Sequence, residues 1–162
     1  MNYRFYNARI LTMETDRLIT GELWVQDGKI LYVGDGSDTD GVCAGGQGAE
    51  DGKSRWDREI DCGGNLLMPG FKNAHTHSGM TLLRSYADDL PLQDWLFKQV
   101  FPIEDKMDGE MIYHLTKLAV LEYLTSGITS IFDMYLTPET TAKACVDMGM
   151  RFVQVSGTSI IN

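Results

Sequence analysis

The sequence predicts an α/β fold in which part of a small β-sandwich precedes the first three strands of a (β/α)₈ TIM-type barrel. Two observations predict this fold class. The first third of the chain has the patterns of short strands, and the second half alternates strand, helix, strand, helix and strand. A complete barrel of this type needs roughly 250 residues, so the 162 residues of this chain are expected to hold only its beginning.

The first third is expected to form three strands. Tyr3–Leu11 alternates loosely between apolar and polar residues, and two shorter apolar runs follow at Glu22–Gln26 and Lys29–Val33. Between the last two runs stands Asp27-Gly28, a pair that tolerates positive φ angles and therefore favours a two-residue turn. The segment LWVQDGKILYVG is accordingly predicted to be a β-hairpin.

A polar segment interrupts the strands at residues 35–58. It is dense in Gly, Asp and Ser and has no apolar period. It is expected to be a surface loop, because it cannot bury enough apolar surface to offset the entropy lost on ordering. A short strand is expected after it, at Glu59–Asp61. These patterns divide the chain into a partial β-sandwich domain at residues 1–65 and the N-terminal part of a barrel domain at residues 66–162.

The second half predicts three buried strands joined by helices. The run FKNAHTH, residues 71–77, begins apolar and ends polar, as a barrel strand does where it reaches the functional rim. A helix at Gly109–Ser126 is expected from its apolar faces and from the Gly127 that stops it. This order implies parallel strands with helical crossovers. The other expected elements are a helix at Pro91–Val100, a strand at Ile128–Met134, a helix from Thr137-Pro138 to about Met148, and a strand at Arg151–Val155.

Composition excludes several classes of protein. The chain has 14 basic and 23 acidic residues, for a formal charge of −9, so no basic surface is expected to hold a nucleic acid or an anionic membrane. The N-terminus lacks the pattern of a signal peptide, and no apolar stretch approaches the roughly 18 residues of a membrane helix. The cysteines, at Cys43, Cys62 and Cys145, form no disulfide or zinc pattern and indicate a reducing cytoplasm.

His75-Thr76-His77 is the motif that carries chemistry. Residues two apart on a strand project to the same side, so both imidazoles are able to bind one metal ion while Thr76 points away. Imidazole is a common ligand of divalent metals, and the motif ends the first predicted barrel strand, where the sites of such barrels lie. The alternative is a pair of histidines bonded to backbone carbonyls. The remaining His114 is expected to pack or to be solvated on its helix.

The motif lies within residues 69–107, which read PGFKNAHTHSGMTLLRSYADDLPLQDWLFKQVFPIEDKM. This stretch resembles the amidohydrolase superfamily, and within it most closely the deaminases of 5′-methylthioadenosine and S-adenosylhomocysteine. That family usually shows Pro-Gly shortly before Asn-x-His-x-His, then a Thr-Leu-Leu-Arg-Gly run, an acidic Asp-Asp-Leu and a Trp-Leu pair. The chain has these features, with Ser85 where Gly is commoner. The run GITSIFDMY at the second barrel strand is also family-like, and the likeness covers nearly the whole chain except the Gly/Asp-rich loop.

The resemblance implies a (β/α)₈ barrel with a composite β-sandwich that the far C-terminus completes. It implies that His75 and His77 bind one divalent metal ion, zinc in preference to iron, together with a His and an Asp from later strands. The metal would lower the pKa of bound water toward ~7, and the hydroxide would attack the amino-bearing ring carbon of a purine and release ammonia. The proton-transfer residues are expected beyond residue 162, so this chain alone is expected to be inactive.

The resemblance also carries over two substrate-binding positions. Glu104, in PIED, matches a position whose carboxylate accepts hydrogen bonds from the ribose hydroxyls, which suits a vicinal diol. A surface or helix-start acid is the alternative. Trp95 matches a residue that lines the pocket, with core packing as the alternative. Asp88 and Asp89 are expected to be caps or loop hydrogen-bond partners, and Asp133 a structural residue or one just outside the ring of metal ligands.

The predicted function is therefore hydrolytic deamination of an adenosine-type nucleoside. A guanine deaminase or a chlorohydrolase-type amidohydrolase is the alternative within the enzymes, and the ribose anchor favours the nucleoside. An alternative of another class is a truncated, non-catalytic fragment that binds metal weakly through two histidines. The expected partners are the small-molecule nucleoside and, through exposed sheet edges, further copies of the chain as a homo-oligomer.

Overall fold

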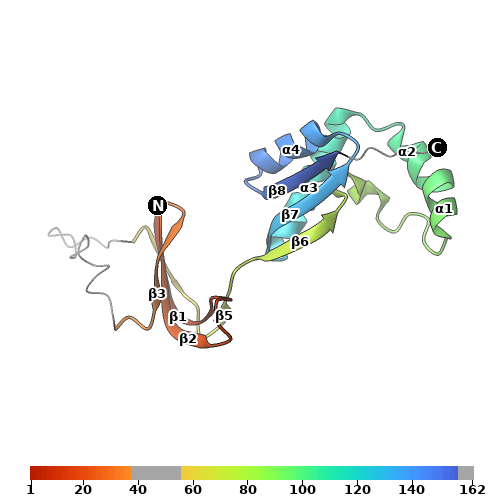
Figure 1. Ribbon diagram of the computed structural model, residues 1–162. Coiled ribbons are helices and arrows are strands. Elements are labelled where there is room, and N and C mark those ends of the chain that lie inside the picture. Colours follow the sequence, from red (N-terminus) through yellow and green to blue (C-terminus); the bar gives the residue numbers. More distant parts are fainter. Residues whose placement is uncertain (38–55, 157–162) are drawn as a thin grey trace. The chain divides into compact units, whose positions relative to one another are not determined.

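The computed structural model describes residues 1–37 and 56–156, and the chain forms two compact units, Met1–Pro69 and Gly70–Asn162 (Figure 1). Most of the Gly/Asp-rich segment, including Cys43, lies outside the described residues. The strands and helices are those of a mixed α/β protein, as predicted. In the described part of the chain, no helix is long and apolar enough to cross a membrane.

The first unit is a five-stranded sheet. Strands β1 to β4 lie in the order β3-β2-β1-β4, and β5 pairs with β1 beyond the end of β4. The pairs β1–β2 and β2–β3 are antiparallel, whereas β4 and β5 run parallel to β1. The bounds are β1 Asn2–Leu11, β2 Leu18–Gln26, β3 Lys29–Gly34, β4 Arg58–Asp61 and β5 Leu66–Leu67.

The predicted β2–β3 hairpin is confirmed. It turns at Asp27-Gly28, whose φ angles are both positive, at 48° and 78°. Asn7 has a third positive φ, 54°, at a bulge where the register between β1 and β2 shifts. Asn adopts this left-handed conformation more readily than most residues, so the bulge occurs at a residue that tolerates it.

Arg4 joins the strands on either side of β1. Its guanidinium donates to both carboxylate oxygens of Glu22 on β2, and it donates to Glu59 on β4 at 2.9 Å. Glu22 also accepts a hydrogen bond of 2.8 Å from the indole of Trp24. The hydrogen bond from Arg4, above all, holds the pKa of the Glu22 carboxyl below its usual range.

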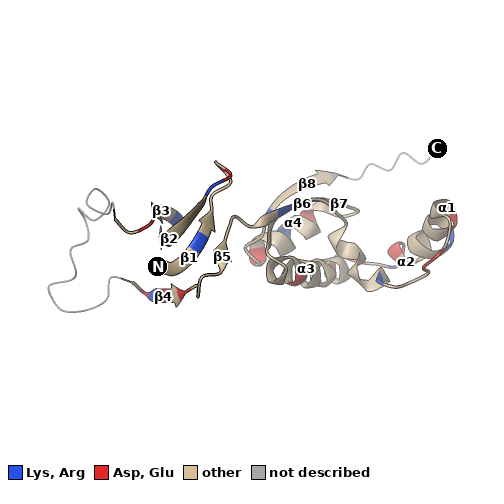
Figure 2. Cartoon of the chain, turned by 90° about the horizontal axis from the view of Figure 1, so that it is seen from below, with Lys and Arg blue, Asp and Glu red and all other residues tan. Residues whose placement is uncertain are grey.

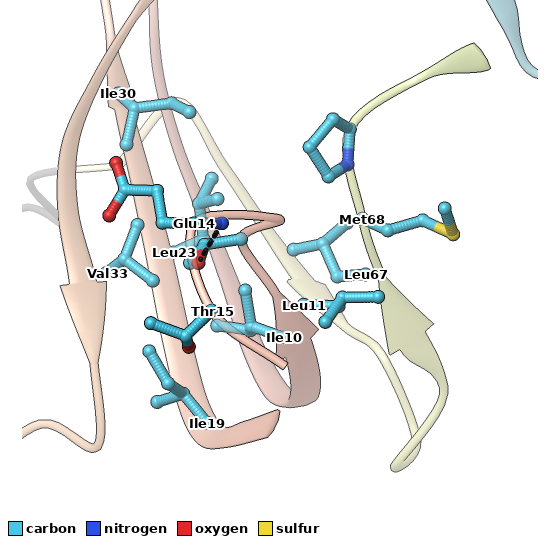
Figure 3. Close-up of a pocket in the computed structure, with 12 residues that line it drawn as sticks. Ile10, Leu11, Glu14, Thr15, Ile19, Leu23, Ile30, Val33, Leu67 and Met68 are labelled. Atoms are coloured by element: carbon cyan, nitrogen blue, oxygen red, sulfur yellow. Dashed lines mark hydrogen bonds between the residues drawn. The ribbon is translucent and has the colours of Figure 1, made fainter. Parts of the chain in front are cut away.

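One face of this sheet carries an apolar pocket of about 550 Å³ (Figure 3). Its apolar lining comes from β1, β2, β3, β5 and the segment that follows β5. Aliphatic side chains dominate it: Ile10, Leu11, Ile19, Leu23, Ile30, Val33 and Leu67. The sheet therefore presents apolar surface on this side.

The second unit is a three-stranded parallel sheet in the order β6-β7-β8. Its strands are β6 (Phe71–Thr76), β7 (Ile128–Tyr135) and β8 (Arg151–Ser156). The helices α3 (Gly109–Thr125) and α4 (Pro138–Asp147) connect them. Both helices lie on one face of the sheet (Figure 2), as successive right-handed crossovers require. The predicted alternation of strands and helices is confirmed.

The core of the second unit lies between this sheet and its helices. Along β7 the burial alternates, so that Ile131, Asp133 and Tyr135 are buried, whereas Phe132 and Met134 are 44% and 43% exposed. The buried cluster on the helical side consists of Val120, Ile131, Cys145 and Met150. On the opposite face Phe132, Met134 and Val153 are exposed, and no described element covers them.

The segment between β6 and α3 differs from the prediction. A 3₁₀ turn, η2 (Ser78–Leu83), follows β6 without a periodic signal in the sequence. The expected helix at Pro91–Val100 is longer and in three parts: α1 (Leu92–Trp95), the π-helical η3 (Leu96–Val100) and α2 (Phe101–Glu104). The amide of Phe101 bonds to the carbonyl of Leu96, one residue further back than in an α-helix. The next residue, Pro102, has no amide hydrogen to continue the α-helical pattern.

The loop between η2 and α1 contains backbone strain. Ser85, Ala87 and Asp89 have φ angles of 57°, 58° and 63°, a conformation that costs residues other than glycine about 1–2 kcal/mol each. The family pattern more often has glycine at the position of Ser85, and glycine adopts this φ without a steric cost.

Gly79 in η2 lies against the ring of Tyr135, and a Cβ at Gly79 would come within 2.1 Å of it. Replacement Gly79→Ala is expected to lower the free energy of unfolding by about 1–3 kcal/mol, because the buried ring has no room to move. Gly109→Ala is the matched control, since its Cβ would meet only Thr140 Oγ1 at 3.5 Å. Urea unfolding of both variants checks this, and equal stabilities would contradict it.

Residues 1–162 expressed by themselves are expected to self-associate. The open face of the second sheet exposes apolar side chains that no described element covers, among them Phe132 at 44% and its strand partner Val153 at 54%, and such surfaces drive association. Light scattering after size exclusion measures the mass. The isosteric variant Val153→Thr is expected to associate less, and a monodisperse monomer that unfolds cooperatively would refute the expectation.

Candidate metal centre

The two histidines of the HxH motif face one another at the end of β6. His75 Nε2 and His77 Nε2 are 3.0 Å apart, and the two rings meet edge to face with their centroids 4.9 Å apart. Two nitrogens that bind one zinc ion at 2.0–2.1 Å cannot be more than about 4.2 Å apart. The pair therefore fits the requirement for a shared metal ion. A small cavity lined by Ala74, His75, Thr76, His77, Phe132 and Met134 adjoins it.

The tautomer of His77 leaves the correct nitrogen available. His77 Nδ1 lies 2.7 Å from the backbone carbonyl oxygen of Met134 on β7. Because a carbonyl oxygen only accepts, Nδ1 carries the hydrogen and Nε2 keeps its lone pair. Histidines that bind metals usually donate their other nitrogen in this way, which fixes the ring as well as the tautomer.

A buried carboxylate lies on the other side of the strand. Thr76 points away from the histidines and donates to Asp133 Oδ2 at 2.7 Å and to the Phe132 carbonyl at 3.1 Å. Ser78 donates to the same Asp133 oxygen with its amide, at 2.9 Å, and with its hydroxyl. Asp133 is fully buried. The chain on both sides of His77 is thus bonded to β7.

The described residues provide two ligands. Among residues 1–37 and 56–156, no three His, Cys, Asp or Glu side chains gather closely enough to hold a metal ion. Asp133 is bonded to Thr76, which alternates with the histidines along β6, and so it does not complete the set. A structural or catalytic zinc site uses three or four protein ligands, and the described residues supply this pair only.

Glu104, at the end of α2, is buried and bonded to β7. Its Oε1 accepts a hydrogen bond of 2.9 Å from the hydroxyl of Tyr135, the last residue of β7. Burial, and next the bond to Glu104, raise the pKa of Tyr135 far above its ordinary value, so this phenol remains a donor at physiological pH. Sequence reasoning missed Tyr135. Its place two residues after Asp133, on the same buried face of a strand, was the available signal.

The other candidate residues lie on α1, in the loop before it and on α3. Trp95 is half-buried on α1, whose main contacts are with η3. Asp88 and Asp89 are exposed in the strained loop before α1. His114 is exposed on α3, which agrees with the expectation that it is solvated.

Solved structures with a similar fold include several that contain zinc. An adenosine deaminase from Xanthomonas campestris with bound zinc has a TM-score of 0.77 and 29% sequence identity, and the match covers 93% of this chain and 33% of that one. The atrazine chlorohydrolase of Arthrobacter aurescens, complexed with zinc, has a TM-score of 0.74 at 21% identity, with 95% and 35% covered. The second similarity shows the fold alone.

Curated relatives are named as deaminases. The chain is 44% identical over 146 residues to a 5-methylthioadenosine/S-adenosylhomocysteine deaminase of Desulforamulus reducens, a match that covers 89% of this chain and 31% of the relative. It is 41% identical to a 5′-deoxyadenosine deaminase of Methanosarcina acetivorans, with 90% and 31% covered. The chain therefore spans about a third of the length of these relatives. Because the model of the amidohydrolase family matches residues 66–160, more than half of the sequence, the chain belongs to the amidohydrolase family.

Proposed function

We propose that this chain is part of an enzyme that hydrolytically removes the amino group of an adenosine-type nucleoside, such as 5′-methylthioadenosine or S-adenosylhomocysteine. The observation that carries the proposal is the pair of imidazole nitrogens 3.0 Å apart at the end of a parallel strand, in a chain whose relatives are named as deaminases of such nucleosides.

His75 and His77 would hold one divalent ion, and zinc is favoured over iron because the zinc-containing adenosine deaminase shares this fold. A bound divalent ion lowers the pKa of water enough to provide hydroxide near neutral pH, the nucleophile that hydrolytic deamination needs. The chain's own contribution is orientation. The Met134 carbonyl holds His77 in the tautomer whose Nε2 is free to bind. The further ligands and the proton-transfer groups would come from the rest of the enzyme.

Glu104 would anchor the ribose of the substrate. A carboxylate has two oxygens that accept hydrogen bonds, which suits a vicinal diol. Tyr135 occupies Oε1 and so fixes the plane of the carboxylate, while the remaining acceptor capacity would bind ribose hydroxyls. We also assign Trp95, on the helical run that leads to Glu104, to the wall of the substrate pocket.

The finer description of the fold belongs to the same proposal. Strands β6, β7 and β8 would be the first three strands of a (β/α)₈ barrel whose interior is the open face of the sheet. The first unit would be part of a small β-sandwich, and its apolar pocket (Figure 3) is the surface that a second sheet would cover.

The alternatives have less support. No described residue favours the guanine base or a chlorinated ring over a nucleoside, whereas the buried Glu104–Tyr135 pair suits a ribose. A non-catalytic fragment that binds metal through two histidines remains the alternative of another class. It predicts that the cell makes a protein of about this length, without deaminase activity, and the intact mass of the gene product distinguishes the two.

The complete gene product, loaded with zinc, is expected to release ammonia from S-adenosylhomocysteine. His77→Ala is expected to lower kcat/KM more than about 100-fold, because the metal supplies the nucleophile. His114→Ala is the matched control, since this histidine is exposed on α3. Bound zinc is measured beside ammonia release. Full activity in His77→Ala, or no deamination of any adenosine-type nucleoside by the wild type, would refute the proposal.

Glu104→Gln is expected to lower kcat/KM for adenosine about 10–100-fold, the value of a hydrogen bond to a charged acceptor. The same variant should leave kcat/KM for 2′,3′-dideoxyadenosine nearly unchanged, because that substrate has no diol to bind. Tyr135→Phe is expected to show a smaller effect of the same kind. Glu110→Gln, an exposed acid on α3, serves as the control. An equal loss with both substrates would show that Glu104 has only a structural role.

A further inference from the structure

We propose that Asp133 is the positioning residue of the metal centre, holding the HxH segment in the conformation that lets both histidines bind one ion. Thr76 and Ser78, the two residues that flank His77, both donate to Asp133 Oδ2, and three hydrogen bonds converge on this single oxygen. The inference rests on the proposed function, because it assigns a role toward the metal that His75 and His77 would hold.

The backbone pairing between β6 and β7 is irregular where the histidines lie. The register shifts between Asn73 and Thr76, and β6 ends at Thr76. His77 already has φ −130° and ψ 73°, outside the regular strand. The backbone ladder resumes at the single pair Thr76 and Asp133 and ends there, so His77 and Ser78 lie beyond it. The side-chain bonds from Thr76 and the bonds from Ser78 to Asp133 hold the segment in addition to this last pair.

Two consecutive residues of β7 hold His77 from both sides. The side chain of Asp133 fixes the chain before and after His77, and the carbonyl of Met134 accepts from the His77 ring at 2.7 Å. A shift of either contact would move Nε2 away from the nitrogen of His75. Both contacts come from one short segment of β7, so a single rigid element sets the position of the backbone and the direction of the ring.

Core packing alone does not explain a carboxylate at this position. Asp133 is fully buried, and its Oδ1 accepts no hydrogen bond from the described residues. A buried carboxylate oxygen without a partner is costly. Two residues earlier, on the same face of β7, Ile131 fills the core with an apolar side chain. The feature that distinguishes Asp133 is its Oδ2, which accepts hydrogen bonds from the Thr76 hydroxyl and from the amide and hydroxyl of Ser78, beside the histidines.

The test measures Co²⁺ binding to the complete gene product, from its d–d absorption and from competition with a chelator. Asp133→Ala is expected to weaken Co²⁺ affinity about 10–100-fold, as losses of groups that orient metal ligands do, and to change the d–d spectrum. Asp133→Asn keeps a carbonyl oxygen for the three donors and is expected to bind Co²⁺ within about threefold of wild type. This rescue separates positioning from a role of the negative charge.

Asp147→Asn is the control, since Asp147 is an exposed carboxylate on α4 that pairs with Lys143. A folded Asp133→Ala with wild-type affinity and spectrum would overturn the inference, as would an equal loss of affinity in Asp147→Asn. If Asp133→Ala does not fold, Thr76→Val and Ser78→Ala each remove hydrogen bonds to Oδ2 while the carboxylate stays. Wild-type affinity in both would also overturn it, and weaker affinity would support it. A wild type that binds no Co²⁺ would instead refute the metal site itself.

Discussion

The parallel pairing of β6 with β7 is the constraint on which the rest of the site depends. Because parallel strands end at the same edge of a sheet, the HxH segment at the end of β6 meets the run Asp133 to Tyr135 at the end of β7. This one register brings His77 to the Met134 carbonyl and Thr76 to Asp133. It also places Gly79 against Tyr135, and Tyr135 in turn holds Glu104. These functional or supporting residues are thus positioned by one strand pair.

Because side chains alternate along these strands, the residues that would bind a metal ion and the residues that hold them in place lie on opposite faces of the sheet. Residues that would bind a metal ion must be accessible to it, whereas residues that hold them in place must not move. His75 lies on the exposed side of β6, and Thr76 and Asp133 lie between the sheet and its helices. Packed side chains have little freedom, so the buried face is the rigid one. The supporting hydrogen bonds from Thr76 and Ser78 to Asp133 are located there, and His75 points the other way.

Much of this arrangement was predictable from the sequence, and the reason is that periodicity is a local property. The strands, α3, α4 and the Asp27-Gly28 turn follow from patterns within a few residues. The HxH motif predicted a shared metal ion through its place at the end of a barrel strand and through the family resemblance. The contact between Tyr135 and Glu104 joins residues 31 positions apart, and no local pattern reports it. The same is true of Asp133, whose burial follows from alternation, but whose partners depend on the register of two strands. The π-helical turn before Pro102 was missed for a different reason. It lies at Leu96–Val100, inside the predicted helix, where apolar periodicity does not distinguish a π-helical turn from an α-helical one, and α2 then extends the helix to Glu104.

The histidine pair has no further metal ligands among the described residues, and the sheet that carries it has an apolar face that no described element covers. Two imidazoles leave a divalent ion with open coordination positions, and the face of the sheet toward which they point carries exposed apolar residues such as Phe132 and Met134. In the proposed barrel, residues at the carboxyl ends of the strands that follow would add metal ligands. The inward side chains of the same strands would cover the apolar face. Metal binding and closure of the core would then stabilise the same state, so that each ligand contributes to folding as well as to chemistry. The contribution of β6 and β7 to this state is a pair of nitrogens whose separation and tautomer are set by hydrogen bonds within the described chain.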